Sequence, residues 1–389
     1  MTRNLQRLII TDSLFRIDTD ADKEEEKVSA KYELSKLGSL SYGGTVFHNE
    51  NGDTIHEDSG YAQYFIPEKA RNYPMIFWHG LGQSGVCFER TVDSQEGFMQ
   101  DFLSDNWPCY IVDQPRRGRA ARTRSLPKEL MSPSAACESG VWTGFRLGTW
   151  FPPESPKAFS NLAFPMTPLA IDQFMRQQCP DGGEEPRTNE YLEELGANMG
   201  ELIKQAGPSI LFTHSMSGKY GWFTAMYGGD NLKAIISYEP GCQFAWPDGQ
   251  FPDVDSPVLD IIDTYMGMLS VPMEDFLKLT KIPIRILYGD NITKVPIADY
   301  GQDKWRVAVE RGRKFVELIN SYGGDAQLIQ LPEIGITGNS HSGFQETNHA
   351  QIADYVKAQL HELGLDGDDQ PNCGPVPKEV PEFTIPYRD

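Results

Sequence analysis

The sequence predicts an α/β fold in which a mostly parallel central sheet is flanked by helices. From about residue 74 onward, short apolar runs alternate with longer stretches of helical periodicity, a pattern typical of successive strand–helix–strand units. The runs are almost continuously apolar, as in strands that are buried on both faces. The expected strands are residues 74–78, 109–112, 209–213, 234–238, 284–288 and 326–331.

An antiparallel pair of strands is expected ahead of the parallel ones. Residues 39–47 and 61–66 both have strand-like composition, and Asn51-Gly52 between them is a typical hairpin turn. The helices expected between the later strands are residues 95–104, 189–205, 219–226, 304–321 and 347–363.

Two stretches interrupt the alternation of strands and helices. Residues 116–186 are rich in Pro, Arg, Trp and Phe, and residues 243–281 form a second insertion. Both follow strands, so we expect them at the carboxyl edge of the sheet, where open α/β folds bind ligands, and there they would form a cap. The predicted organisation is an N-terminal arm over 1–35, a domain over 36–363 that includes both insertions, and a C-terminal tail over 364–389.

Composition narrows the partners and the location. The 389 residues carry a formal net charge of −20, which argues against nucleic acid or an anionic membrane surface as the main partner. No apolar stretch reaches the roughly 20 residues that span a bilayer, and the N-terminus lacks the pattern of a signal peptide. We therefore expect a cytoplasmic protein without a membrane span, and a homodimer stays open. The six cysteines form no CxxC pair or Cys/His cluster, so neither a zinc site nor a redox motif is indicated.

The strongest local motif centres on Ser215. An apolar strand runs into Thr213-His214-Ser215-Met216-Ser217, and a helix is expected to follow. This is the order of a nucleophile elbow, a tight turn that exposes a serine hydroxyl and needs small residues two places before and after it. Thr213 and Ser217 replace the usual glycines, so the motif is a variant, and an ordinary strand-to-helix turn is the alternative. The motif predicts the α/β-hydrolase fold with Ser215 as the nucleophile.

A second motif, His79-Gly80-Leu81, ends an early strand. In this fold such a turn supplies one backbone N–H of the oxyanion hole, and the residue after the nucleophile supplies the other. Leu81 and Met216 are therefore the predicted oxyanion donors. His79 itself is expected to stabilise the turn and to take no part in catalysis.

The predicted general base is His341, in the segment Gly338-Asn339-Ser340-His341 between the last strand and the last helix. Hydrolases of this fold order the triad as serine, acid, histidine, and His341 is late and loop-borne, as that order requires. His349, on the following helix, is a poorer candidate that the sequence leaves open.

Two carboxylates compete for the role of the triad acid. Asp290 follows the expected strand 284–288, and Glu239 ends the expected strand 234–238. Whichever serves must accept a hydrogen bond from the histidine Nδ1 and hold the tautomer in which Nε2 faces Ser215. Reasoning from the residues alone leaves both open.

Seven segments carry a resemblance to a known family. In this order they are LSYGGTV, IFWHG, YIVDQPRRGRA, THSMSG, SYEPG, YGDNI and GITGNSH. Over residues 36–363 the chain resembles the bacterial esterase 713-like family of α/β hydrolases. The resemblance implies an esterase whose triad acid is a glutamate after the strand that follows the nucleophile, matched here by Glu239-Pro240-Gly241. It thus favours Glu239 and leaves Asp290 as a supporting carboxylate.

The chain departs from the family at the predicted oxyanion turn. The type member has adjacent cysteines where this chain has Leu81-Gly82, so any role of a vicinal disulfide there is absent. The insertion over 243–281 is also larger than the family pattern, so the family's substrate specificity does not transfer.

The first insertion holds clusters of arginines and aromatics. The arginines are interpreted as a solvated, salt-bridged entry to the cap, with a carboxylate clamp as the alternative. The aromatics are expected to pack the cap and in part to line an apolar pocket. The arginines are Arg116, Arg117, Arg119, Arg122 and Arg124, and the aromatics are Trp142, Phe145, Trp150, Phe151, Phe159 and Phe164.

The predicted function is hydrolysis of a carboxylic ester through a Ser215–His341–Glu239 triad and an acyl-enzyme. This reaction implies no metal or organic cofactor. The predicted substrate is a small ester or lactone that is partly apolar or aromatic. The same triad also suits a lactonase, thioesterase, acyltransferase or cyclase acting on a larger metabolite. A non-catalytic binding member of the fold is the alternative from a different class.

Overall fold

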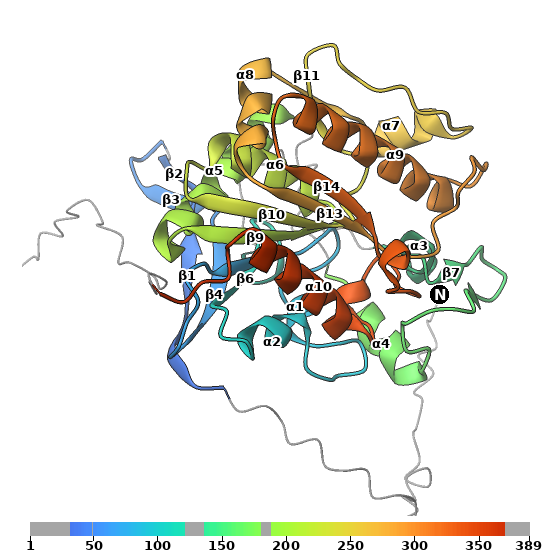
Figure 1. Ribbon diagram of the computed structural model, residues 1–389, viewed down its shortest axis with the longest axis horizontal. Helices are drawn as coiled ribbons and strands as arrows, with labels where there is room; N and C mark the ends of the chain where they lie inside the picture. Colours follow the sequence, from blue (N-terminus) through green and yellow to red (C-terminus); the bar gives the residue numbers. More distant parts are fainter. Residues whose placement is uncertain (1–31, 49, 121–135, 180–187, 370–389) are drawn as a thin grey trace, which may run out of the picture. The chain divides into compact units, whose positions relative to one another are not determined.

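The computed structural model describes residues 32–48, 50–120, 136–179 and 188–369, and an eight-stranded sheet lies at its centre (Figure 1). Strand β4 pairs antiparallel with β1 and with β6, and the remaining pairs are parallel. The predicted mostly parallel sheet is therefore confirmed. The strands, in their order across the sheet, are β1 (Leu34–Tyr42), β4 (Gly60–Pro67), β6 (Cys109–Asp113), β5 (Met75–Trp78), β9 (Ser209–His214), β10 (Leu232–Tyr238), β13 (Ile284–Tyr288) and β14 (Ala326–Gln330).

Helices cover both faces of this sheet, so its inner strands are buried throughout, as their continuous apolar sequence predicts. Figure 1 shows α1, α2 and α10 on one side and α5, α6 and α9 on the other. The five predicted helices correspond to α2, α5, α6, α9 and α10, with ends shifted by a few residues. The helices on the two faces of the sheet are α1 (Val86–Glu89), α2 (Phe98–Leu103), α5 (Asn189–Ala206), α6 (Ser217–Tyr227), α9 (Tyr300–Ser321) and α10 (His349–Glu362).

The predicted antiparallel pair is present as β1 and β4, but one detail of the prediction is wrong. The stretch 39–47 is not one strand, because it breaks at Gly43 and Gly44, whose φ angles are +58° and +82°. The chain then forms a separate hairpin from β2 (Thr45–His48) and β3 (Thr54–Glu57). Asn51-Gly52 lies between these two strands and does not connect β1 to β4 directly.

The first insertion leaves the sheet after β6 and the second after β10. The described part of the first contains α3 (Glu138–Gly144), β7 (Gly148–Thr149), β8 (Lys157–Ala158) and α4 (Pro168–Arg176). The second contains β11 (Ala245–Pro247), α7 (Leu259–Met266), β12 (Leu269–Val271) and α8 (Met273–Phe276). β11 pairs with β12, and α7 packs against α9.

Candidate active site

Ser215 lies in the turn between β9 and α6, at the carboxyl edge of the sheet. Its φ angle is +55°, a left-handed conformation that residues other than glycine adopt rarely and with strain. Ser215 N donates a hydrogen bond to Tyr238 O at the end of β10, at 3.0 Å. The predicted nucleophile therefore occupies a strained strand-to-helix turn of the kind that exposes a serine hydroxyl.

Hydrogen bonds hold the two residues that replace the usual elbow glycines. Ser217 Oγ donates to Trp78 O and accepts from His214 N, both at 2.8 Å, and so joins the ends of β5 and β9. Thr213 Oγ1 donates to Ser237 Oγ on β10 at 2.8 Å. Because all these groups are buried, the bonds satisfy hydroxyls that would otherwise destabilise the turn.

The turn after β5 packs directly against Ser215. A Cβ atom built on Gly80 would lie 2.8 Å from Ser215 Cβ, so only glycine allows this approach. Within the described ranges, neither the Leu81 nor the Met216 backbone N–H donates a hydrogen bond. Both predicted oxyanion donors thus have unused N–H groups: Met216 follows Ser215 in the chain, and Leu81 follows Gly80, which packs against Ser215.

The structure brings His341 and Glu239 together in a buried pair. His341 Nδ1 lies 2.6 Å from Glu239 Oε2, a distance typical of a charge-assisted hydrogen bond. The His341 ring packs against Trp305, with ring centroids 4.1 Å apart, and against Phe145, at 5.1 Å. His341 N also donates to Phe145 O at 2.9 Å. Aromatic packing and this backbone bond therefore restrict the position of the imidazole.

Among the described residues, no hydrogen bond joins Ser215 Oγ to His341. Such a bond commonly tightens only when substrate is bound. The hydrogen bond at Nδ1 directs the other ring nitrogen, Nε2, away from Glu239, as a general base requires.

Three groups in addition to His341 fix the Glu239 carboxylate. Gly289 N donates to Oε1 at 2.7 Å, and both terminal nitrogens of Arg146 donate to the carboxylate, one of them to Oε2 at 2.5 Å. The backbone of Glu239 is also held, since its N–H donates to Leu287 O at 2.8 Å. This carboxylate therefore has every lone-pair direction occupied by a donor.

These contacts set the protonation states of the pair. Burial opposes ionisation of Glu239, but Arg146 and His341 outweigh it and lower its pKa to about 2. Burial disfavours the imidazolium and lowers the pKa of His341 to about 4, against the opposing effect of Glu239. At neutral pH the pair consists of a carboxylate and a neutral imidazole.

Asp290, the competing carboxylate, is bonded elsewhere. Its Oδ2 accepts from Gly338 N at 3.0 Å and from Asn161 Nδ2 at 3.2 Å, and its Oδ1 accepts from Asn291 N at 2.7 Å. These bonds tie the first insertion and the loop before His341 to the end of β13. The geometry thus favours Glu239 over Asp290 as the partner of the histidine.

The other candidate histidines lie apart from the Glu239 pair. His349 is on α10, with Nδ1 2.5 Å from Asp101 Oδ2. His79 is buried in the turn after β5, where its Nδ1 lies 2.9 Å from Gly80 O and its Nε2 accepts from Gln114 N at 3.4 Å. These contacts agree with the turn-stabilising role expected for His79.

Three residues near the site carry no local sequence signal. Arg146 is buried and reaches Glu239 from the first insertion, 93 residues away in the chain. His214 packs against the His341 ring with centroids 4.6 Å apart, and its Nε2 lies 2.8 Å from His341 O. Glu346 accepts from Ser340 N at 3.1 Å, and burial raises its pKa to about 7. A signal for these residues exists only in three dimensions.

The described arginines of the cluster differ in exposure: Arg116 and Arg117 are buried, whereas Arg119 is partly exposed. Arg116 is buried against Asp58 at 3.2 Å and stacks on Tyr191. Arg119 pairs with Asp113 at 2.7 Å. The prediction of solvated arginines is wrong for Arg116, which is buried against the Asp58 carboxylate, and for Arg117, which is buried and donates to Arg116 O at 3.3 Å. Arg122 and Arg124 lie outside the described residues.

The described residues hold no group of three or more His, Cys, Asp or Glu side chains arranged to bind a metal ion. Within the same ranges, every helix is too short or too polar to cross a bilayer.

Comparisons with known proteins place these features in context. No family model matches the chain. A fungal protein named "Probable secreted lipase phiG", from Fungal sp. (strain ATCC 74256), is 25% identical over 322 residues, which cover 76% of this chain and 84% of that protein. The solved structure of a novel bacterial esterase is 29% identical, with a TM-score of 0.67, and covers 86% of this chain and 98% of its own. The fungal relative is called secreted, so the cytoplasmic location remains a prediction for this chain.

The fold and these likenesses point in one direction. The mostly parallel sheet with helices on both faces matches the bacterial esterase over almost its whole length, and the relative in sequence is a lipase by name. The chain is an enzyme with the α/β-hydrolase fold, and it is a carboxylic-ester hydrolase of the esterase and lipase kind.

Proposed function

We propose that the enzyme cleaves its ester through a Ser215–His341–Glu239 triad and an acyl-enzyme intermediate. His341 takes the proton from Ser215 Oγ as the hydroxyl attacks the ester carbonyl, and then gives it to the leaving alcohol. Water, activated by the same imidazole, attacks the acyl-enzyme and releases the acid. Atoms balance as ester plus water giving acid plus alcohol.

The observation that carries this proposal is the buried 2.6 Å contact between His341 Nδ1 and Glu239. It supports a neutral imidazole whose Nδ1 carries the proton and whose Nε2 is free to act as base. As the imidazolium forms, the ionised Glu239 stabilises it at short range in a site from which water is excluded.

The oxyanion is proposed to bind between the Leu81 and Met216 backbone N–H groups. Both groups are unused among the described residues, and Gly80 brings one turn against the other. Donors already in place lower the barrier because they need no reorganisation when charge develops, and each contributes roughly 3 kcal/mol in comparable sites.

A fluorophosphonate probe tests the proposal, because it reacts only with an activated serine. We expect one adduct, which peptide mapping assigns to Ser215, and we expect the Ser215→Ala variant to lose both labelling and ester turnover. Ser342→Ala is the matched control, since Ser342 is also buried beside His341 and has no proposed role. An adduct on another residue, or ester turnover by folded Ser215→Ala enzyme at the wild-type rate, would refute the triad.

A further inference from the structure

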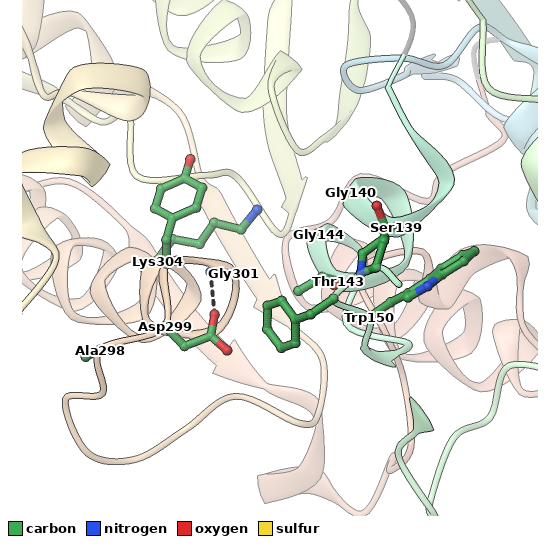
Figure 2. Close-up of a pocket in the computed structure, with 12 residues that line it drawn as sticks. Ser139, Gly140, Thr143, Gly144, Trp150, Ala298, Asp299, Gly301 and Lys304 are labelled. Atoms are coloured by element: carbon green, nitrogen blue, oxygen red, sulfur yellow. Dashed lines mark hydrogen bonds between the residues drawn. The ribbon is translucent and has the colours of Figure 1, made fainter. Parts of the chain in front are cut away.

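A cavity of about 630 Å³ lies between α3 and the N-terminal turn of α9 (Figure 2). Its size suits one portion of a small ester. Aromatic rings form much of its wall. The lining residues are Ser139, Gly140, Thr143, Gly144, Trp150, Phe151, Pro152, Ala298, Asp299, Tyr300, Gly301 and Lys304.

Lys304 is the one cation among the described residues that line this cavity. Its Nζ lies 5.4 Å from the Tyr300 ring centroid and 4.9 Å from that of Trp305. Within the described part of the chain, the ammonium makes no hydrogen bond and no ion pair. A partly buried ammonium that packs on aromatic rings and makes no hydrogen bond lacks the acceptors that usually offset its desolvation.

The acidic residue of the cavity does not neutralise Lys304 directly. Asp299 caps α9, because its carboxylate accepts from Gly301 N and from Gln302 Nε2, both at 2.8 Å. Figure 2 shows the Lys304 side chain extending from α9 toward the side of the cavity where Ser139 and Gly140 lie. Thr143 also lines the cavity, and its buried hydroxyl has no hydrogen-bond partner in the described residues.

The cavity shares its walls with the proposed triad. Trp305, whose ring lies against Lys304, also stacks on the His341 imidazole with centroids 4.1 Å apart. Gly144 lines the cavity, and the next residue, Phe145, packs against the His341 ring. Lys304 and the proposed base thus both contact the indole ring of Trp305.

We propose that this cavity binds an ionised carboxylate carried by the ester substrate, with Lys304 as the cationic partner and Thr143 as a second donor. The inference rests on the proposed function and specifies its substrate class: an ester with a free carboxylate on an apolar or aromatic body. The aromatic walls suit that body, and a charge-assisted hydrogen bond to the ammonium would give the selectivity.

Two matched substrate pairs test which side of the ester carries the carboxylate. Aryl hydrogen glutarate and aryl pentanoate differ by a carboxylate at the end of the acyl chain. Meta-acetoxybenzoate and meta-tolyl acetate differ by a carboxylate on the alcohol side. We expect wild-type kcat/KM to favour the carboxylate substrate in at least one pair, and equal values in both pairs would overturn the proposal.

Variants of Lys304 connect this preference to the cavity. Lys304→Met should lower the ratio of kcat/KM values, carboxylate over neutral, by about 10- to 100-fold, and Lys304→Arg should restore part of it. Lys314→Met, an exposed lysine on the same helix, is the control and should leave the ratio unchanged. An equal loss on both substrates of a pair would show that Lys304 only supports Trp305, and the proposal would be wrong.

A binding measurement separates this inference from the triad. Calorimetric titration of Ser215→Ala enzyme with both members of each substrate pair needs no turnover. We expect the carboxylate ester to bind more tightly in at least one pair, and the added Lys304→Met change to remove the difference. Equal binding within both pairs would overturn the cavity assignment even if the probe labels Ser215, and a missing label would refute the triad alone.

Discussion

The ends of β10 and β13 are neighbours in the sheet and each is followed by a carboxylate, yet the two carboxylates have different tasks. Glu239 leaves β10 with a φ of +50°, is fully buried and contacts His341. Asp290 leaves β13 one residue further from the strand, is partly exposed and bonds backbone N–H groups and Asn161. Position at the carboxyl edge therefore makes a residue a candidate, and backbone direction with side-chain length selects between candidates.

Arg146 connects the two strand ends. Its terminal nitrogens bind the Glu239 carboxylate, and its Nε donates to the Asp290 carbonyl oxygen at 3.0 Å. One guanidinium thus binds the carboxylate of Glu239 and the backbone carbonyl of Asp290. Changes at either carboxylate, at the arginine or at the glycine between them should accordingly have graded effects.

The largest effect is expected from removing the charge of Glu239. Glu239→Gln should lower kcat by about 10³- to 10⁴-fold, because the amide no longer holds the required histidine tautomer or stabilises the imidazolium. Asp290→Asn should lower kcat less than about 10-fold. Steady-state kinetics on one neutral ester measures both variants, and the reverse ranking would show that Asp290 is the acid.

The next largest effect is expected from removing Arg146, and it should lower the stability of the fold. Arg146→Met leaves the buried Glu239 carboxylate without its main compensating charge, which should lower the free energy of unfolding by about 3–5 kcal/mol. Urea unfolding at pH 7 measures the loss. Arg176→Met is the control, because this arginine is exposed in a surface pair with Asp172 and should change stability little. An unchanged midpoint for Arg146→Met would contradict the buried ion pair.

A smaller loss of stability is expected from substitution of Gly289, which lies between the two carboxylates. A Cβ there would approach Asn339 O to 2.6 Å and Glu239 Oε1 to 2.9 Å. Gly289→Ala should therefore destabilise the fold by about 1–3 kcal/mol through overpacking. Gly140→Ala is the control, because a Cβ at Gly140 would meet open space. Equal stability of Gly289→Ala and Gly140→Ala would argue against the close packing.

The smallest effect concerns pH. Burial lowers the pKa of His341 to about 4. The imidazole therefore stays neutral when the pH falls below 6.5, which is about the pKa of an ordinary histidine. The enzyme should keep at least about half of its pH 7 kcat/KM at pH 5, where an imidazole of ordinary pKa would keep about 4%. The pKa of Glu239, about 2, lies too low to add a second step in this range.

The Arg146→Lys variant sharpens the pH comparison. Arg146 lowers the pKa of His341, so a cation with poorer contact to Glu239 should move the acid limb of the profile upward by less than about one pH unit. Asp290→Asn should leave the limb in place. Circular dichroism at each pH separates titration of the histidine from acid unfolding, and an acid limb near pH 6.5 in the wild type would contradict a histidine kept neutral by burial.

Local sequence patterns predict the strands of the central sheet and the helices between them. Buried strands are continuous apolar runs, and the turn at Ser215 needs small residues, so both leave local signals. The hairpin of β2 and β3 was not predicted, because the break at Gly43 and Gly44 lies within one apolar-polar run. Long-range choices left no local signal either. The preference for Glu239 over Asp290 came from family resemblance, and Arg146 reaches Glu239 across 93 positions of the chain.

The location of Arg146 also limits how the enzyme can be re-engineered. The arginine belongs to the insertion after β6, whereas the carboxylate that it compensates belongs to the sheet. If that insertion is replaced with one from another hydrolase to change specificity, the buried Glu239 carboxylate loses its compensating charge. The replacement would need an arginine at the same position. For the same reason, amide hydrogens of residues near Arg146 should exchange with solvent only when the sheet itself opens.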